Sequence, residues 1–210
     1  MKFLNPYAEI KMHENHLPHW QQGDALEFVT WRLADSIPQA KLSEWMELRD
    51  AWMKHHPKPW DETAEQEYHK RFSRKLDEWL DEGYGACVLK DPENAAIVAN
   101  ALRHFDGDRY ELDSFVVMPN HVHILFRPAA DRPLEKVVQS WKGFIAREIN
   151  KRLGAKGTLW QEDYWDRLIR NERHLFKCRE YIRKNPEKAK LRENEYALFE
   201  KPGTGKSPLR

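Results

Sequence analysis

The sequence predicts an α+β domain over residues 25–192, in which helices cover one face of a single sheet. Segments with the alternating pattern of strands and segments with helical spacing follow in the order strand, helical stretch, strand, helix, strand, strand, helix, strand and helix. The 210 residues suffice for one hydrophobic core. No run approaches the roughly 20 apolar residues of a membrane-spanning helix, so we expect a cytoplasmic protein with no membrane partner.

The first part of the chain contains one strand and a long helical stretch. Residues 1–24 show little periodicity and predict an irregular N-terminal arm. Residues 25–34 alternate as in a strand, and residues 41–82 carry apolar side chains at helical spacing around a proline-rich turn. We therefore expect a helical insertion after the first strand, and its acidic composition argues against phosphate binding there.

The middle of the chain predicts a strand, a helix and a hairpin. Residues 84–90 have the composition of a short strand. Asp91 and Pro92 are suited to the N-cap and the first position of the helix that follows. Residues 110–118 and 121–127 are two strand-like runs separated by a Pro-Asn pair, which predicts a hairpin.

The last part of the chain predicts two helices around an extended segment. Pro133 begins a long amphipathic helix, which Gly154 ends. Residues 160–169 are expected to be extended, and the next helix to end at Lys184, before an Asn-Pro pair. Residues 193–210 are predicted to be a flexible tail, and the part from Pro202 on contains few apolar side chains.

The net charge of +1 conceals a strong asymmetry along the chain. Residues 1–131 hold 15 Lys and Arg against 23 Asp and Glu, a balance of −8. Residues 132–192 hold 17 against 8, a balance of +9. This asymmetry suggests a polyanion-binding face on the C-terminal part. A pair of solvated helices is the alternative interpretation.

His121 and His123 are two residues apart in a predicted strand, so their side chains point to the same face of the sheet. Two neutral imidazoles that converge on one point can hold a divalent metal together with an oxygen ligand. The alternative is a pair of half-buried histidines on a solvated sheet face.

Tyr181 and Asn185 are four residues apart on the last predicted helix and therefore share one helical face. An amide oxygen is a suitable third metal ligand, and a phenolic oxygen beside a phosphate held by the metal can act as a nucleophile. Taken alone, Tyr181 is more simply explained as a packing aromatic. The sequence leaves open whether it reaches the histidines of its own chain or those of a partner in a homodimer.

Three motifs occur in a single order: Val117–His123 (VMPNHVH), Trp141–Gly143 (WKG) with Leu159–Arg167 (LWQEDYWDR), and Tyr181–Pro186 (YIRKNP). Jointly they resemble the REP-associated tyrosine transposases, which belong to the HUH single-tyrosine superfamily and are related to the insertion sequence 200 transposases. The resemblance covers about residues 25–38 and 84–192. It leaves out the helical insertion.

The resemblance implies a ferredoxin-like β-α-β-β-α-β core with an antiparallel sheet and a C-terminal helix that carries the tyrosine. It also implies metal-dependent cleavage and strand transfer of single-stranded DNA at hairpin-forming, REP-like elements through a 5′-phosphotyrosine. His121 and His123 match the HUH pair that holds Mg²⁺ or Mn²⁺. Asn185 stands where relatives place a polar third ligand, and Tyr181 matches the nucleophile.

The basic C-terminal part fits a DNA partner, because phosphates supply most of the affinity of such proteins and unpaired bases stack on aromatic rings. The residues expected to contact DNA are Lys136, Lys142, Arg147, Lys151, Arg152, Trp160, Arg167, Arg170, Arg183 and Lys184.

Two other functions compete with the transposase hypothesis. A non-catalytic regulatory module would bind nucleic acid through the same fold and basic face, without cleavage. A metal-dependent hydrolase would use water as its nucleophile and would stay active without Tyr181.

Overall fold

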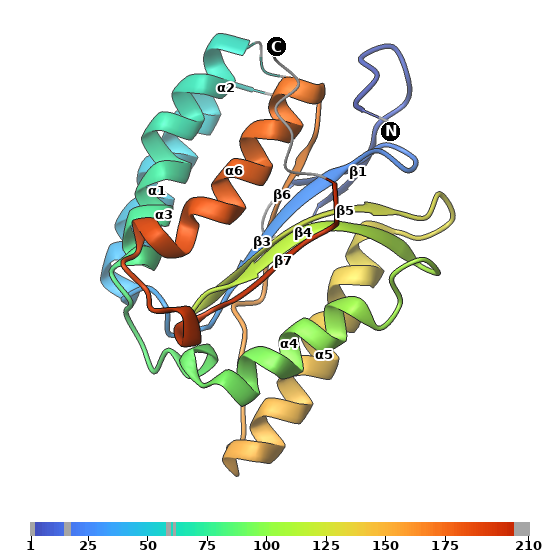
Figure 1. Cartoon of the computed structure of the whole chain (residues 1–210). Coiled ribbons are helices and arrows are strands. Elements are labelled where there is room, and N and C mark those ends of the chain that lie inside the picture. Colours follow the sequence, from blue (N-terminus) through green and yellow to red (C-terminus); the bar gives the residue numbers. More distant parts are fainter. Residues whose placement is uncertain (1–2, 15–17, 58–59, 61, 204–210) are drawn as a thin grey trace.

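The computed structural model describes the whole chain except residues 1–2, 15–17, 58–59, 61 and 204–210. A five-stranded sheet lies between two groups of helices, and a separate two-stranded sheet lies near the N-terminus (Figure 1). Within the described residues, no helix is long and apolar enough to cross a membrane.

The five-stranded sheet is antiparallel throughout, with the strand order β6-β3-β5-β4-β7. Its strands are β3 (Glu27–Arg32), β4 (Tyr110–Val117), β5 (His121–Pro128), β6 (Trp165–Leu168) and β7 (Ala197–Glu200). Along the chain, β3, α4, β4, β5, α5 and β6 follow one another, which is the ferredoxin-like arrangement. The predicted α+β fold class is therefore confirmed.

Among the described residues, six α-helices lie on the two sides of the sheet. They are α1 (Gln39–His55), α2 (Glu62–Tyr68), α3 (Arg74–Asp81), α4 (Pro92–Arg103), α5 (Leu134–Leu153) and α6 (Glu172–Lys188). A π-helical segment, His69–Ser73, joins α2 to α3. We call residues 39–81, which hold α1 to α3, the insertion. As predicted, Asp91 caps α4, and Gly154 ends α5 in a left-handed conformation with a φ of 61°.

The helices cover both faces of the sheet, so the prediction of helices on one face was wrong (Figure 1). Helices α4 and α5 pack on one face, where Ile124 and Trp31 of the sheet join Trp141 of α5 in the main core. Helix α6 packs on the other face against Val116 and Leu125. Both faces need a helical layer because the central strands carry buried apolar side chains on each of them.

Residues 84–90 do not form the predicted strand. The chain turns at Gly85, whose φ is +84° and where an added Cβ would lie 2.6 Å from the Asp35 carbonyl oxygen. It then forms a 3₁₀ turn, Val88–Lys90, in which the Leu89 N–H donates to the Pro119 carbonyl. Apolar residues here fill the end of the core without pairing in the sheet.

Helix α6 continues through Pro186 to Lys188, so the predicted end at Lys184 was wrong. A proline in the last turn removes only one donor, and the helix still closes through the Ala189 N–H, which donates to the Asn185 carbonyl. The extra turn keeps Asn185 inside the helix.

Both ends of the chain are more regular than predicted. Residues 11–14 (β1) and 18–21 (β2) pair as antiparallel strands, so the irregular arm was a wrong prediction over these residues. In the predicted tail, β7 pairs with β4, and Phe199 stacks on Phe115 with ring centroids 5.2 Å apart. The apolar side chains of this short segment suffice to add it to the sheet. Residues 204–210 of the predicted tail lie outside the described residues.

Candidate active site

His121 and His123 lie side by side on the face of β5 opposite the main core. Each is 1% exposed, and their ring centroids are 4.6 Å apart. Burial lowers the pKa of His121 to about 3 and that of His123 well below its ordinary value, with a smaller contribution from the charge of Lys188. Both imidazoles are therefore neutral at physiological pH, which is the form that binds metals.

Hydrogen bonds at the Nδ1 atoms fix both rings. The side-chain amide of Asn120 donates to the carbonyls of Leu80 and Tyr84 at 3.1 and 3.4 Å, which sets its orientation. Its Oδ1 therefore accepts from His121 Nδ1, at 2.7 Å, and the lone pair of this ring is at Nε2. His123 Nδ1 is 2.7 Å from the Thr30 hydroxyl, which can accept its proton in the same way. Such anchoring is typical of metal-binding histidines.

Tyr181 reaches the histidine pair of its own chain. Its hydroxyl lies 3.5 Å from His123 Nε2, and the two rings meet edge to face at 5.0 Å. The Asp77 carboxylate, from the insertion, accepts a hydrogen bond from this hydroxyl. Burial, followed by the nearby charges of Asp77 and Asp81, raises the pKa of Tyr181 well above its ordinary value, so the hydroxyl is protonated at rest.

Asn185 completes the group from the next turn of α6. It is 2% exposed, its amide bonds to the Tyr181 hydroxyl, and its Oδ1 has no hydrogen-bond partner among the described residues. A buried acceptor with no partner is what a third metal ligand beside two imidazoles requires. Within the described chain, no three His, Cys, Asp or Glu side chains form a metal-holding cluster, so the fit depends on the Asn185 amide.

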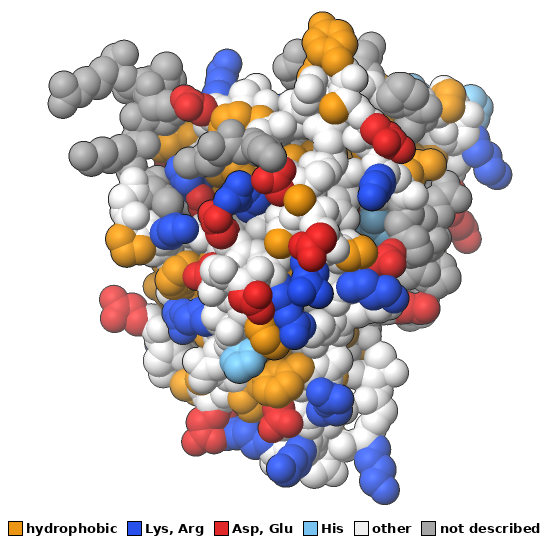
Figure 2. All heavy atoms as spheres, turned by 90° about the vertical axis from the view of Figure 1, so that its right-hand side faces the viewer, with side chains coloured by type: hydrophobic (Ala, Val, Ile, Leu, Met, Phe, Trp, Pro, Cys, Tyr) orange, Lys and Arg blue, Asp and Glu red, His pale blue; other side chains and the backbone are white. Residues whose placement is uncertain are grey.

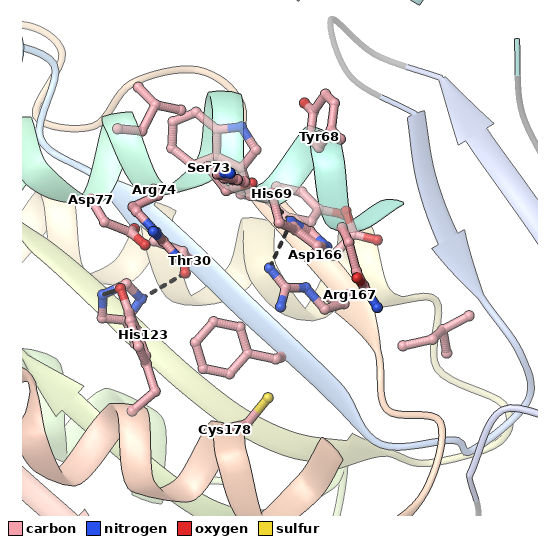
Figure 3. A pocket seen from close by; sticks show the side chains of 18 of the residues that line it. Thr30, Tyr68, His69, Ser73, Arg74, Asp77, His123, Asp166, Arg167 and Cys178 are labelled. Carbon is pink, nitrogen blue, oxygen red and sulfur yellow. Dashed lines mark hydrogen bonds between the residues drawn. The ribbon is translucent and has the colours of Figure 1, made fainter. Parts of the chain in front are cut away.

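A cleft of about 1370 Å³ leads from solvent to His123 and Tyr181. Its floor includes Thr30 of β3, one wall is the insertion, and the opposite wall includes residues of α6 and β6. In Figure 3, Arg74 and Asp77 of the insertion lie close to the Thr30–His123 pair. The candidate site is thus open to a ligand although its histidines are buried.

The residues predicted to contact DNA do not gather on one surface. Helix α5 packs on the face of the sheet away from the histidines, so Lys136, Arg147 and Lys151 lie far around the molecule from the cleft. Arg167 and Arg170 do line the cleft, and Arg167 donates to His69 Nδ1 at 3.2 Å. On the face shown in Figure 2, Lys and Arg side chains are interspersed with Asp and Glu and form no single basic field.

Two of the predicted DNA contacts are structural. Trp160 is 4% exposed and donates to the Lys142 carbonyl, which leaves no free ring face for a base. Lys142 Nζ donates to the carbonyls of Gln161 and Glu162 at 2.8 and 2.7 Å, and burial lowers its pKa to about 8.

Three more of the residues predicted to contact DNA form ion pairs with acidic side chains. Arg152 pairs with Asp91 and Glu93, Arg183 with Glu200, and Lys184 with Glu180.

Sequence reasoning missed several residues of the site. Asp77 and Arg74 come from the insertion, whose position over the site no local pattern indicates. Thr30 is an ordinary strand residue that pairs with His123 only through the sheet register. The sequence could have indicated Asn120, because this residue directly precedes His121 in the hairpin turn and its side chain is therefore close to the imidazole.

Fold and site define a class of protein: a ferredoxin-like domain whose central strand presents two buried histidines to a tyrosine of the same chain. Residues 88–185 match the family model for IS200-like transposases. Over this segment, which is slightly less than half of the chain, the protein is similar to the IS200-like transposases. The matched segment holds both histidines, Tyr181 and Asn185, and it excludes the insertion.

Two solved structures are similar to the chain. A REP-associated tyrosine transposase bound to a REP hairpin is 16% identical, with a TM-score of 0.44, over 83% of this chain and 74% of that chain. A candidate transposase from Deinococcus radiodurans is also 16% identical, with a TM-score of 0.35, over 88% of this chain and 98% of that chain. A search of curated proteins found no significant match.

Proposed function

We propose that the chain is a metal-dependent tyrosine transposase that cleaves and rejoins single-stranded DNA at hairpin-forming, REP-like elements in the cytoplasm. One observation carries the proposal: the Tyr181 hydroxyl lies 3.5 Å from His123 Nε2. A phosphate held at the histidine pair would be within reach of this hydroxyl, so nucleophile and substrate would meet in a reactive geometry.

His121, His123 and the Oδ1 of Asn185 are the groups that would hold Mg²⁺ or Mn²⁺. Their fit rests on two neutral imidazoles with Nε2 available and on a buried amide oxygen without a partner. When bound, such an ion supplies Lewis-acid polarisation of the scissile phosphate. Asn120 and Thr30 keep both imidazole rings in the ligand orientation.

In the reaction, the Tyr181 oxygen forms a bond to phosphorus while the bond to the 3′ oxygen breaks. The products are a 5′-phosphotyrosine and a 3′-hydroxyl, which takes its proton from solvent. Asp77 accepts the hydrogen bond of the phenol and is therefore placed to take the phenol proton during attack. Attack by a second 3′-hydroxyl on the phosphotyrosine reverses these steps and joins two strands.

The test is incubation of a labelled single-stranded hairpin oligonucleotide with the protein and Mn²⁺. We expect a slowly migrating covalent adduct that is absent with a chelator and in Tyr181→Phe, a variant that keeps the ring packing against Phe28 and His123. Cleavage that persists in Tyr181→Phe would indicate a hydrolase that uses water. Hairpin binding without cleavage, unaffected by chelation and by His121→Ala, would indicate the regulatory binding module.

One chain supplies all the proposed catalytic side chains, so the first cleavage needs no tyrosine from a second copy. A homodimer stays a prediction, and size-exclusion chromatography with light scattering would test it.

A further inference from the structure

The cleft is too large for an ordinary small-molecule site. Its volume of about 1370 Å³ exceeds the roughly 300–1,000 Å³ typical of such pockets. It extends from Trp60 at the far end of the insertion to Tyr181 and Lys188 of α6. A ligand that fills it would be extended, and part of it would lie against the candidate nucleophile.

Exposed cations line the insertion wall of the cleft. Lys54, Lys70 and Arg74 are exposed, and no ion-pair partner is found for them in the part of the chain that the structure describes. On the opposite wall, Arg170 and Lys177 are also exposed.

The acidic residues of the cleft are mostly engaged. Asp50 pairs with Arg49, Asp166 pairs with His19, and Asp77 accepts from Tyr181. Lys54, Lys70 and Arg74 carry positive charge on the insertion wall, and this charge favours an anionic ligand.

Aromatic rings lie among these cations. Trp60, Tyr68 and Trp165 are half-buried and line the same cleft. A basic groove interleaved with aromatic rings is the usual surface for an unpaired nucleic acid strand, because exposed bases can stack on the rings while the phosphates contact the cations. Bases in a duplex are already stacked and cannot use these rings.

We infer that the cleft between the insertion and α6 binds one unpaired DNA strand that runs onto Tyr181, with Lys54, Lys70 and Arg74 contacting its phosphates. The inference rests on the proposed function for the identity of the ligand. It differs from the expectation, drawn from the acidic composition of the insertion, that phosphate binding is not the task of this segment. The insertion is acidic overall, but its cleft wall carries exposed cations.

Binding is measured separately from cleavage by using the Tyr181→Phe protein with a chelator. The first probe is a fluorescent hairpin oligonucleotide with an unpaired flank, and the second is a fluorescent blunt duplex. Binding of each probe is measured by fluorescence anisotropy. The cleft variant combines Lys54→Gln, Lys70→Gln and Arg74→Gln. The matched control combines Lys136→Gln, Arg147→Gln and Lys151→Gln on α5, which removes the same number of exposed charges.

We expect the cleft variant to bind the flanked hairpin about 100-fold more weakly at about 0.1 M salt, with a salt slope smaller by about 2, since each single-strand phosphate contact contributes about 0.7 to the slope. Its affinity for the blunt duplex should change by less than about threefold, as should the affinity of the α5 control for the flanked hairpin. Thermal unfolding should be the same for all variants, because only exposed side chains change.

Two outcomes would overturn the inference: unchanged affinity of the cleft variant for the flanked hairpin, or equal weakening for hairpin and blunt duplex. These outcomes are distinguishable from failure of the proposed function. If the wild-type protein forms no adduct with Mn²⁺ but the cleft variant binds the flank more weakly, the strand-binding cleft stands and the transposase chemistry fails. If the wild-type protein forms the adduct but the cleft variant binds the flanked hairpin as tightly as the protein with an unchanged cleft, the transposase chemistry stands and the strand-binding cleft fails.

Discussion

The two faces of the sheet differ sharply, although the same strands form both. Toward α4 and α5, Val122 and Ile124 of β5 pack in a continuous apolar core with Trp141. Toward the insertion and α6, the alternate residues His121 and His123 are equally buried but lie among polar side chains beside an open cleft. Because successive side chains of a strand point to opposite faces, neighbouring residues of β5 lie either in the apolar core or in the candidate active site. Substitutions one residue apart should therefore affect either chemistry or stability.

The largest expected effect is on chemistry. His123→Ala removes an imidazole that is 3.5 Å from the nucleophile, and we expect adduct formation with Mn²⁺ to slow by more than about 100-fold. The rate is measured in single turnover, at a temperature where circular dichroism shows the variant to be folded. Adduct formation within tenfold of wild type would mean that the polar face is not the reacting one.

On the apolar face, Trp141→Ala should be the most damaging single truncation. The ring packs against Tyr110 and Phe126 at 4.7 and 4.9 Å, and its Nε1 donates to the Tyr110 hydroxyl. We expect a loss of about 3–5 kcal/mol in the free energy of unfolding, measured by urea denaturation. Trp141→Phe, the control, keeps an aromatic ring and should lose less. A loss below about 1 kcal/mol for the alanine variant would contradict the importance of this core.

The contact of β2 with β6 and the residues before it should also respond to pH through His19. This residue of β2 bonds to Asp163 at 2.7 Å and to Asp166 at 2.5 Å. Burial lowers the pKa of His19, but the two carboxylates outweigh it and raise the pKa to about 9. Because the folded pKa exceeds the unfolded value of 6.5, the stabilisation is full below pH 6.5 and is lost as pH rises through 9.

Urea denaturation at pH 6 and pH 9.5, in wild type and in His19→Gln, tests this linkage. The wild-type protein should lose about 3 kcal/mol more than the variant across this interval. Parallel losses in the two proteins would show that the His19 proton is not coupled to folding.

The smallest effect should come from Ile124→Val, one residue from His123 but on the other face. Removal of one buried methylene should cost about 1 kcal/mol of unfolding free energy. The rate of adduct formation should not change, because the side chain points away from Tyr181. A rate change of tenfold or more would show that the two faces are coupled.

Local patterns predicted the elements of the core. The hairpin of β4 and β5 follows from two alternating runs around a Pro-Asn pair, and α5 follows from helical spacing between Pro133 and Gly154. The shared face of His121 and His123 also needed only the strand period.

Features that depend on distant contacts could not be predicted in this way. Asp77 approaches Tyr181 only because the insertion folds over the same face as α6. The short strand β7 forms because it pairs with the edge of β4. Helix α6 continues through Pro186 because the Ala189 N–H still donates to the Asn185 carbonyl in the last turn. The net charge of the insertion likewise gave no indication of where its cations point.

The four residues of β7 have a consequence for the chain as it is made. Without them, the backbone groups of β4 from Ser114 to Val117 would form an open edge, in a strand whose side chains are largely apolar. Such edges pair readily with other chains. Protection from self-association therefore begins only after residues 197–200 have been synthesised, and a chain that stops before Ala197 should aggregate even though its catalytic side chains are all present.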